Sequence, residues 1–248
     1  MPHEPINRSL DILGVKPIAD AVDTATTVVV KGASAFLSRI CLPAAEEFGL
    51  LLQDKVRLWR ARNAAAVAQK AERILGPDNG PTVQAHPRLV GVVLEEGSWM
   101  DVDQVQEMWA GLLASSCSPA GDDDSNLMFA DLLARLSVSQ ARLLNHVCSV
   151  ATKGLSPGGL LVAEGLCPTL QELQAISGVT DVHRLDREID HMRSMELLTI
   201  SSGFSPRSKN QADLTPTTLA IQMYARCKGH RGEPESYFGL SPVAGPAA

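Results

Sequence analysis

The stretch EEGSWMDVDQVQEMWAGLLASS, residues 95–116, places acidic residues and a tryptophan directly before an apolar run. Asp101 is positioned to cap a helix, and Gln104 lies three residues later, as a capping box requires. One apolar stripe follows at helical spacing: Val102, Val105, Met108, Trp109, Leu112 and Leu113. The helix dipole favours acids at this end, and no suitably placed His, Lys or Cys accompanies them. The stretch therefore predicts a helix start with Trp109 in the core, not a catalytic pair of carboxylates.

The composition is that of an ordinary globular protein with one or two domains. Of the 248 residues, 45% are apolar, 20% are charged and only 4% are aromatic. The net charge of −6 argues against a strongly basic nucleic-acid-binding protein. Five widely spaced cysteines without a C-x-x-C pair favour reduced thiols in the cytoplasm. Neither a secretory signal nor an apolar run of transmembrane length is expected.

We expect a mainly α fold, in which a helical domain is followed by a winged-helix-like C-terminal domain with one small β-hairpin. The predicted organisation is a mobile head at 1–17, a helical domain at 18–150 and a winged-helix-like domain at 151–228. A tail at 229–248 is rich in glycine and proline and is predicted to be disordered.

Helical periodicity predicts the elements of the helical domain. A helix within 18–42 contains a β-branched cluster and is either a core helix or an interfacial one. A longer helix starts at Pro43 and stops at the turn sequence GPDNGP. A short helix around 89–94, the helix of the quoted stretch and two helices within 127–150 follow. A capping box at Ser137 opens the last of them.

The C-terminal part has the pattern of a helix-turn-helix followed by a hairpin. Thr169 opens the first helix with a capping box, Gly178 supplies the turn, and Thr180 is expected to cap the second helix. Alternating β-branched residues and a polar tip predict the hairpin near 197–214. Thr215 and the proline after it are expected to start the last helix. This order of elements is that of a winged helix.

The quoted stretch and the helices after it resemble the abortive infection alpha (Abi-alpha) family of bacterial proteins. The residues that match its pattern are Glu96, Gly97, Trp109, Ala110, Leu112, Leu113, Ala114, Leu136 and Ser137. The similarity covers about residues 40–228, and Gly111 departs from the polar residue that is more usual there. The resemblance implies a role in bacterial defence against phage by abortive infection. It implies no catalytic mechanism, because the matched residues are mostly core and helix-cap residues.

No motif of a known active site occurs in the sequence. The six histidines form no H-x-x-x-H pair, and G-x-S-x-G, P-loop and G-x-G-x-x-G motifs are absent. We therefore expect no catalytic, cofactor-binding or metal-binding residues, and we expect that the protein is not an enzyme.

Two groups of basic residues are candidate contacts with a partner or an anionic surface. The first group consists of Lys55, Arg57, Arg60 and Arg62. It borders an apolar stripe of Leu52, Val56 and Trp59, which favours basic side chains that extend around a core contact. Binding to anionic lipid, nucleic acid or an acidic partner is the alternative for this group.

The second group lies on the recognition helix of the winged-helix interpretation and consists of Arg184, Arg187 and His191. The opposite, core face of this helix is expected to be Val182, Leu185, Ile189 and Met192. Four acids are interleaved with the arginines, whereas DNA-binding proteins usually present a positive footprint. We therefore expect this face to pack against protein, either the helical domain or a second copy, and not to bind nucleic acid.

Three functions remain open at this point. The preferred one is a cytoplasmic anti-phage protein that acts through protein–protein contacts, either with a partner or by self-association. The second is a winged-helix DNA-binding transcriptional regulator. The third is a membrane-acting effector that makes peripheral membrane contact through residues 18–42.

Overall fold

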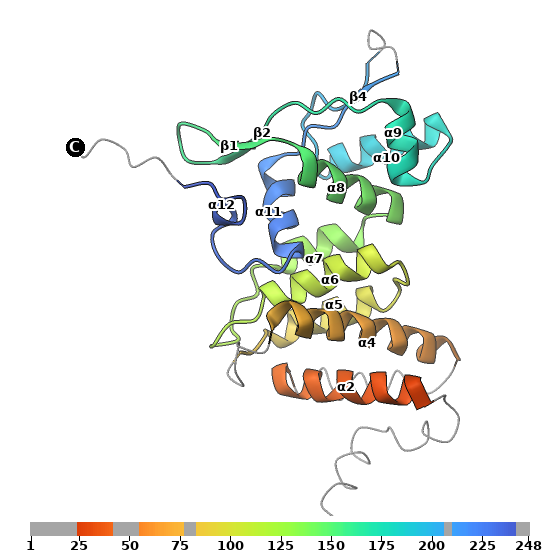
Figure 1. Ribbon diagram of the computed structural model, residues 1–248, viewed down its shortest axis with the longest axis vertical. Coiled ribbons are helices and arrows are strands. Elements are labelled where there is room, and N and C mark those ends of the chain that lie inside the picture. Colours follow the sequence, from red (N-terminus) through yellow and green to blue (C-terminus); the bar gives the residue numbers. More distant parts are fainter. Residues whose placement is uncertain (1–23, 42–54, 77–82, 206–209, 242–248) are drawn as a thin grey trace, which may run out of the picture. The chain divides into compact units, whose positions relative to one another are not determined.

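The computed structural model describes residues 24–41, 55–76, 83–205 and 210–241, and these residues are mainly helical, as predicted (Figure 1). The chain divides into two compact units, residues 1–134 and 135–248. The predicted head at 1–17 lies outside the described residues.

The first unit is built from helices. They are α2 (Thr24–Ile40), α4 (Lys55–Leu75), α5 (Pro87–Gly97), α6 (Asp103–Ser115) and α7 (Leu127–Ala134). Helix α4 lies between α2 and α6 and has its most extensive contacts with these two helices (Figure 1). The predicted helices of this region are therefore confirmed wherever the structure describes them.

Small side chains form the buried face of α4. Its fully buried residues are Ala61, Ala64, Ala65, Val67, Ala68 and Ala71. Alanine has the highest helix propensity, and its short side chain lets neighbouring helices approach closely. The predicted core stripe is wrong for Val56 and Trp59, because the alanine face is buried in its place and these two side chains are 57% and 38% exposed. Leu52, the third member of that stripe, lies outside the described residues.

Trp109 is fully buried, as the quoted stretch predicts. Leu112 and Leu113, which belong to the same predicted stripe, are also fully buried. A Cβ atom added to Gly97 would lie 3.4 Å from Cγ of Trp109 and 3.5 Å from a methyl carbon of Val67. The end of α5 therefore lies close to the indole ring, so that even one added carbon atom would be in van der Waals contact with it.

The start of α6 differs from the prediction. The helix begins at Asp103, and its N-cap residue Val102 makes no capping hydrogen bond through its side chain, so the capping box expected at Asp101 is wrong. Lys70 of α4 holds this end of the helix. Its Nζ donates to Oδ1 of Asp103 at 2.5 Å and to Oε1 of Gln106 at 3.0 Å. The ammonium group of Lys70, from another helix, thus takes the place of the local cap that the sequence suggested.

This contact predicts a pH-dependent contribution to stability. The hydrogen bond and the charge of Lys70 hold the pKa of Asp103 below its ordinary value. Because the pKa is lowered on folding, the stabilisation is present above the ordinary pKa and is lost as the pH falls. We expect the melting temperature of the wild type to fall more steeply than that of Lys70→Met between about pH 5 and pH 3. Lys31→Met, at an exposed lysine of α2, is the control and should follow the wild type.

The second unit contains helices and two small antiparallel hairpins. Its elements are α8 (Val138–Val150), β1 (Lys153–Leu155), β2 (Leu161–Ala163), α9 (Leu170–Ser177), α10 (Val182–Ser194), β3 (Gly203–Phe204), β4 (Ala212–Asp213), α11 (Thr218–Cys227) and α12 (Pro234–Tyr237). Helix α8, which the sequence assigned to the first domain, belongs here because it packs against α9, α10 and α11. The boundary between the units therefore lies at Ala134 and Arg135, not at residue 150.

The hairpin predicted near 197–214 is present as β3 and β4. A second hairpin, β1 and β2, pairs Lys153 with Ala163 and Leu155 with Leu161, so the prediction of one hairpin is corrected to two. The sequence Ser-Pro-Gly-Gly at its tip is typical of a turn and was the available signal for this hairpin. The order of α9, α10, hairpin and α11 matches the layout of a winged helix, and that interpretation stays a prediction.

Local capping signals identified two helix starts correctly. The capping boxes at Ser137 and Thr169 are both present. In each box the cap side chain accepts a hydrogen bond from the backbone N–H three residues later, and the side chain of that later residue accepts one from the backbone N–H of the cap. Gly178 ends α9 with φ of 74°, a left-handed conformation that glycine adopts without steric cost. These features fix the turn between α9 and α10.

Two other caps are shifted by one or two residues. Asp181, not Thr180, caps α10 by accepting a hydrogen bond from a backbone N–H one turn into the helix. Thr217, not Thr215, caps α11. The hydroxyl of Thr215 instead donates to the carboxylate of Asp213 at 2.6 Å, so it is not used for the helix.

The predicted disorder of the tail is wrong for residues 229–241. Helix α12 lies there, and Tyr237 and Phe238 pack their rings against Tyr224 of α11 at centroid distances of 6.0 and 6.4 Å. Contacts between aromatic rings therefore tie this segment to α11, although its glycine and proline content suggested disorder. Residues 242–248 lie outside the described residues.

Candidate functional site

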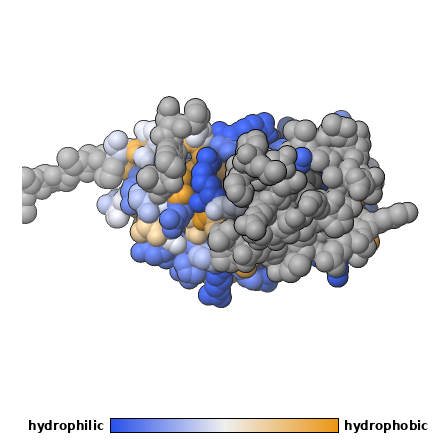
Figure 2. Space-filling model, turned by 90° about the horizontal axis from the view of Figure 1, so that it is seen from below, coloured by the Kyte–Doolittle hydropathy of each residue, from blue (hydrophilic) through white to orange (hydrophobic). Residues whose placement is uncertain are grey.

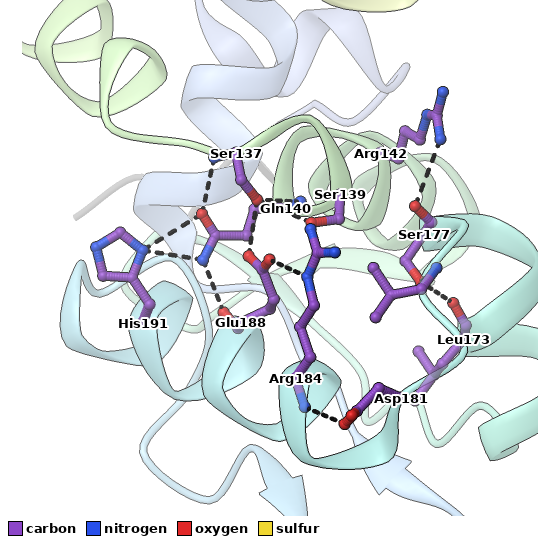
Figure 3. A network of polar contacts seen from close by, with 11 residues as sticks. Ser137, Ser139, Gln140, Arg142, Leu173, Ser177, Asp181, Arg184, Glu188 and His191 are labelled. Carbon is purple, nitrogen blue, oxygen red and sulfur yellow. Dashed lines mark hydrogen bonds and ion pairs between the residues drawn. The ribbon is translucent and has the colours of Figure 1, made fainter.

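The structure brings the second basic group together at one pocket of the second unit. The pocket has a volume of about 360 Å³ and is lined by Arg135, Ser137, Gln140, Arg184, Arg187, Glu188 and His191. Helix α10 supplies Arg184, Arg187, Glu188 and His191, α8 supplies Gln140, and the segment between α7 and α8 supplies Arg135 and Ser137. Figure 3 shows Ser137, Gln140, Arg184, Glu188 and His191. The spacing of residues 184, 187, 188 and 191 places the four side chains on one face of the helix.

Gln140 forms the centre of a polar network behind this pocket (Figure 3). Its side chain is buried, and its Oε1 accepts a hydrogen bond from the backbone N–H of Ser137 at 2.9 Å. Its Nε2 donates to the carbonyl oxygen of Glu188 at 3.0 Å and lies 2.9 Å from Nδ1 of His191. Both amide protons are used when His191 is neutral with its own proton on Nε2. One glutamine thus caps α8 and ties it to α10.

The hydroxyl group of Ser137 is fully committed within the same network. It donates to Oε2 of Glu188 at 2.7 Å, and it accepts from the backbone N–H of Gln140 at 3.3 Å. Since a hydroxyl group has only one proton, Ser139 must be the donor in its 2.8 Å contact with Ser137. Both lone pairs of the oxygen are therefore occupied, and Ser137 serves as the cap of α8.

Glu188 links the network to an arginine of the pocket. Its side chain is only 13% exposed, and Oε1 accepts from Nε of Arg184 at 3.4 Å. The two carboxylate oxygens are thus engaged by a hydroxyl group and by a guanidinium group. Sequence reasoning counted Glu188 as an acid on the exposed face of α10, whereas the structure places it against the start of α8.

The buried face of α10 agrees with the predicted one except at its first residue. Leu185, Ile189 and Met192 are fully buried, as expected. Val182 is 39% exposed, so its assignment to the core face is wrong. The reason is its position at the first residue of the helix, one turn before the buried face begins.

The first basic group belongs to the first unit, where it lies on α4. Arg57 and Arg62 are exposed, and the side chain of Lys55 lies outside the described residues. Arg60 is bound by α5: its Nη2 lies 2.7 Å from Oε2 of Glu95, and its guanidinium group stacks 4.2 Å from the ring of Trp99. This arginine fixes the end of α5.

Two exposed tryptophans lie next to Arg60. Trp59 is 38% exposed and Trp99 is 47% exposed, and their ring centroids are 6.3 Å apart. The motif residues Glu96 and Gly97 lie at the end of α5, directly before Trp99 in the sequence. The motif residue Gly97 is buried beside Trp109, whereas Trp59 and Trp99 form an exposed aromatic surface.

A second pocket of about 470 Å³ is lined by His146, Val150, Leu166, Cys167, Pro168, Glu172, Ala175 and Ile176. Cys167 is the exposed cysteine, and the other four cysteines are buried. Burial raises the pKa of Cys148, and it raises the pKa of Cys227 to about 12, so both thiols stay protonated and unreactive. In the part of the chain that the structure describes, no group of three His, Cys, Asp or Glu side chains could hold a metal ion.

Sequence reasoning missed four lining residues of the first pocket: Arg135, Ser137, Gln140 and Glu188. Ser137 and Gln140 were recognised as a capping box, but a local motif does not reveal which distant helix packs beside it. The spacing of Arg184 and Glu188, one helical turn apart, was the available signal for their ion pair.

The comparisons with known proteins agree with the resemblance seen in the sequence. The curated proteins and the solved structures that were compared contain no match to the chain. The profile of the family described as Abortive infection alpha matches residues 60–241, which is most of the chain and includes the buried tryptophan, the exposed tryptophan Trp99 and the pocket at α10. The chain therefore belongs to the abortive infection alpha family.

Proposed function

We propose that the protein takes part in abortive-infection defence against phage by binding another protein, with Trp59 and Trp99 at the centre of the contact. Family membership supports the defence role. The exposed aromatic pair is the observation that supports a protein contact, because tryptophan and arginine are enriched among the residues that dominate binding energy.

The surroundings of the tryptophan pair indicate the chemistry of the partner. Residues 55–62 contain four basic residues and no acid, and Val56 adds an apolar side chain that is 57% exposed. Arg60 is paired with Glu95, and the side chains of Arg57 and Arg62 are exposed to solvent. An apolar pocket bordered by carboxylates on a partner protein would complement this surface.

A binding role without catalysis is supported by the polar network of the second unit. Ser137 uses its proton and both lone pairs in structural hydrogen bonds, and the Nδ1 atom of His191 is bound to Gln140. An activated nucleophile needs a free lone pair and an adjacent base. Neither Ser137 nor His191 offers this arrangement.

Phage plating tests the proposal. We expect that expression of the wild-type protein in a sensitive bacterial host lowers the efficiency of plating of at least one phage in a diverse panel. Trp59→Ala/Trp99→Ala should lose most of this protection while its thermal unfolding still shows a folded protein. Ile200→Ala is the matched control, because Ile200 is 93% exposed and lies in the other unit, and it should protect fully.

The outcomes separate the three parts of the proposal, which are the defence role, the contact surface and the absence of catalysis. Unchanged plating of every phage by the wild type would contradict the defence role. Full protection by the tryptophan double variant would contradict the contact surface. A metal-dependent nuclease activity of the purified protein that one carboxylate substitution abolishes would contradict the absence of catalysis.

A membrane-acting mechanism through residues 18–42 has less support. Ala33, Phe36, Leu37 and Ile40 of α2 are buried within the first unit, where α2 packs against α4. None of the helices that the structure describes has the length and apolar character needed to cross a bilayer. On the face shown in Figure 2, the visible described residues that are hydrophobic occur in small groups among hydrophilic ones.

DNA binding through α10 also has less support. Arg184 pairs with Glu188, and Arg193 pairs with Asp190 at 2.6 Å. Two of the positive charges on this helix are thus balanced by acids of the same helix, which reduces the positive footprint that a duplex would need.

A further inference from the structure

We propose that the pocket beside α10 binds a small phosphorylated molecule, through a phosphomonoester group that Arg184 and Arg187 hold. The inference rests on the geometry and charge of the pocket and does not depend on the defence role. The tryptophan pair belongs to the first unit and the pocket belongs to the second. The proposed protein contact and the proposed phosphate site can therefore fail independently.

The charge of the pocket favours an anion. Three guanidinium groups and one carboxylate line it, which gives three positive charges less one negative charge, or a net charge of two positives. The carboxylate of Glu188 repels an anion less than a free one would, because Ser137 and Arg184 occupy its oxygens. Asp181 lies outside the lining, and the backbone N–H of Arg184 and, to a smaller extent, the charge of Arg187 lower its pKa.

Two of the arginines have donors left for a ligand. Arg184 contacts Glu188 through Nε, and its side chain is 55% exposed, so its terminal nitrogens remain available. Arg187 is exposed and makes no hydrogen bond with the residues that the structure describes. A guanidinium group presents its donors in a planar fork that matches two oxygens of a phosphate group.

The ligand class follows from charge and size. A phosphomonoester carries close to two negative charges at neutral pH and therefore matches the pocket better than a carboxylate with one. The volume of about 360 Å³ lies at the lower end of the range for small-molecule sites, so it also has room for a sugar-sized group attached to the phosphate. Gln140 holds the wall rigid, because its side chain is buried and fully bonded.

Calorimetric titration of the full chain at about 50 mM salt tests the inference, since electrostatic binding is strong there. The probes are inorganic phosphate, ribose 5-phosphate, acetate and a mixed-sequence DNA duplex. We expect both phosphates to bind, ribose 5-phosphate at least as tightly as inorganic phosphate, and acetate at least tenfold more weakly. Arg187→Gln should weaken both phosphates tenfold or more.

Arg88→Gln is the matched control, because Arg88 is an exposed arginine of α5 and its loss changes the net charge by the same amount. It should bind both phosphates as the wild type does. Phosphate affinity that is unchanged in Arg187→Gln, or acetate that binds as tightly as phosphate, would overturn the inference. Duplex binding tighter than that of ribose 5-phosphate and lost in Arg187→Gln would assign the pocket to nucleic acid and overturn it as well.

Discussion

Replacing Trp109 with alanine is expected to lower the free energy of unfolding by about 3–5 kcal/mol, as for other large core aromatics. The side chain is fully buried, and it packs against Gly97 at the end of α5. Because Gly97 has no side chain that could extend into the space left by the indole ring, the cavity would stay largely open. Chemical denaturation of the full chain, monitored by circular dichroism, measures the loss.

Trp99→Ala is the matched control for this prediction. It removes the same side chain from a position that is 47% exposed, together with a cation–π contact to Arg60. We expect a loss of about 1 kcal/mol or less, the usual value of such a contact at the surface. If both variants lost the same stability, or if Trp109→Ala melted within a degree or two of the wild type, the core assignment would be wrong.

Trp109→Phe should cost less than its loss of volume suggests. The indole Nε1 of Trp109 is buried and has no hydrogen-bond partner among the residues that the structure describes. A buried unsatisfied donor carries a desolvation penalty of about 1–3 kcal/mol, and phenylalanine removes it. This gain offsets part of the stability that is lost through the cavity left by the smaller ring.

Features that depend on neighbours in sequence were predictable. The boxes at Ser137 and Thr169 and the left-handed glycine at 178 involve residues within one helical turn, so spacing alone identifies them. The stripe around Trp109 was predictable for the same reason. At Asp101 the same local rule failed, because Lys70, a residue of another helix, satisfies the start of α6.

The buried face of α4 could not be predicted from hydrophobicity alone. Trp59 and Val56 are more apolar than any alanine of this helix, yet the alanine face is buried and the larger side chains are exposed. Close packing between helices α2, α4 and α6 favours the side chains that allow short interaxial distances. This preference depends on the partner helices, which periodicity does not reveal.

The candidate pocket was predictable only in part. Arg184, Arg187 and His191 share a helix face, and their grouping followed from spacing. Arg135, Ser137 and Gln140 join them through the packing of α8 on α10, two helices about fifty residues apart in the sequence. The acids interleaved along α10 argued against a positive footprint, whereas the lining of the pocket contains three arginines and only one of these acids, Glu188.

Replacing Gln140 with alanine is expected to lower the stability of the second unit by about 2 kcal/mol, because two backbone groups lose their partner. The Ser137 N–H would lose its acceptor, and the Glu188 carbonyl would lose its donor. Both groups lie close to the buried side chain of Gln140, where water replaces a lost partner poorly. Hydrogen exchange of the α8 and α10 amides localises the effect.

Gln171→Ala is the control for this last prediction, because Gln171 is an exposed residue of α9 and should change stability by less than about 0.5 kcal/mol. Gln140→Ala should speed exchange in both α8 and α10, since the side chain ties one helix to the other. Exchange that speeds up only in the first turn of α8 would mean that Gln140 acts as a local cap alone. In that case α10 would keep its position without the tie, and the wall of the pocket would depend on the buried contacts of Leu185, Ile189 and Met192 instead.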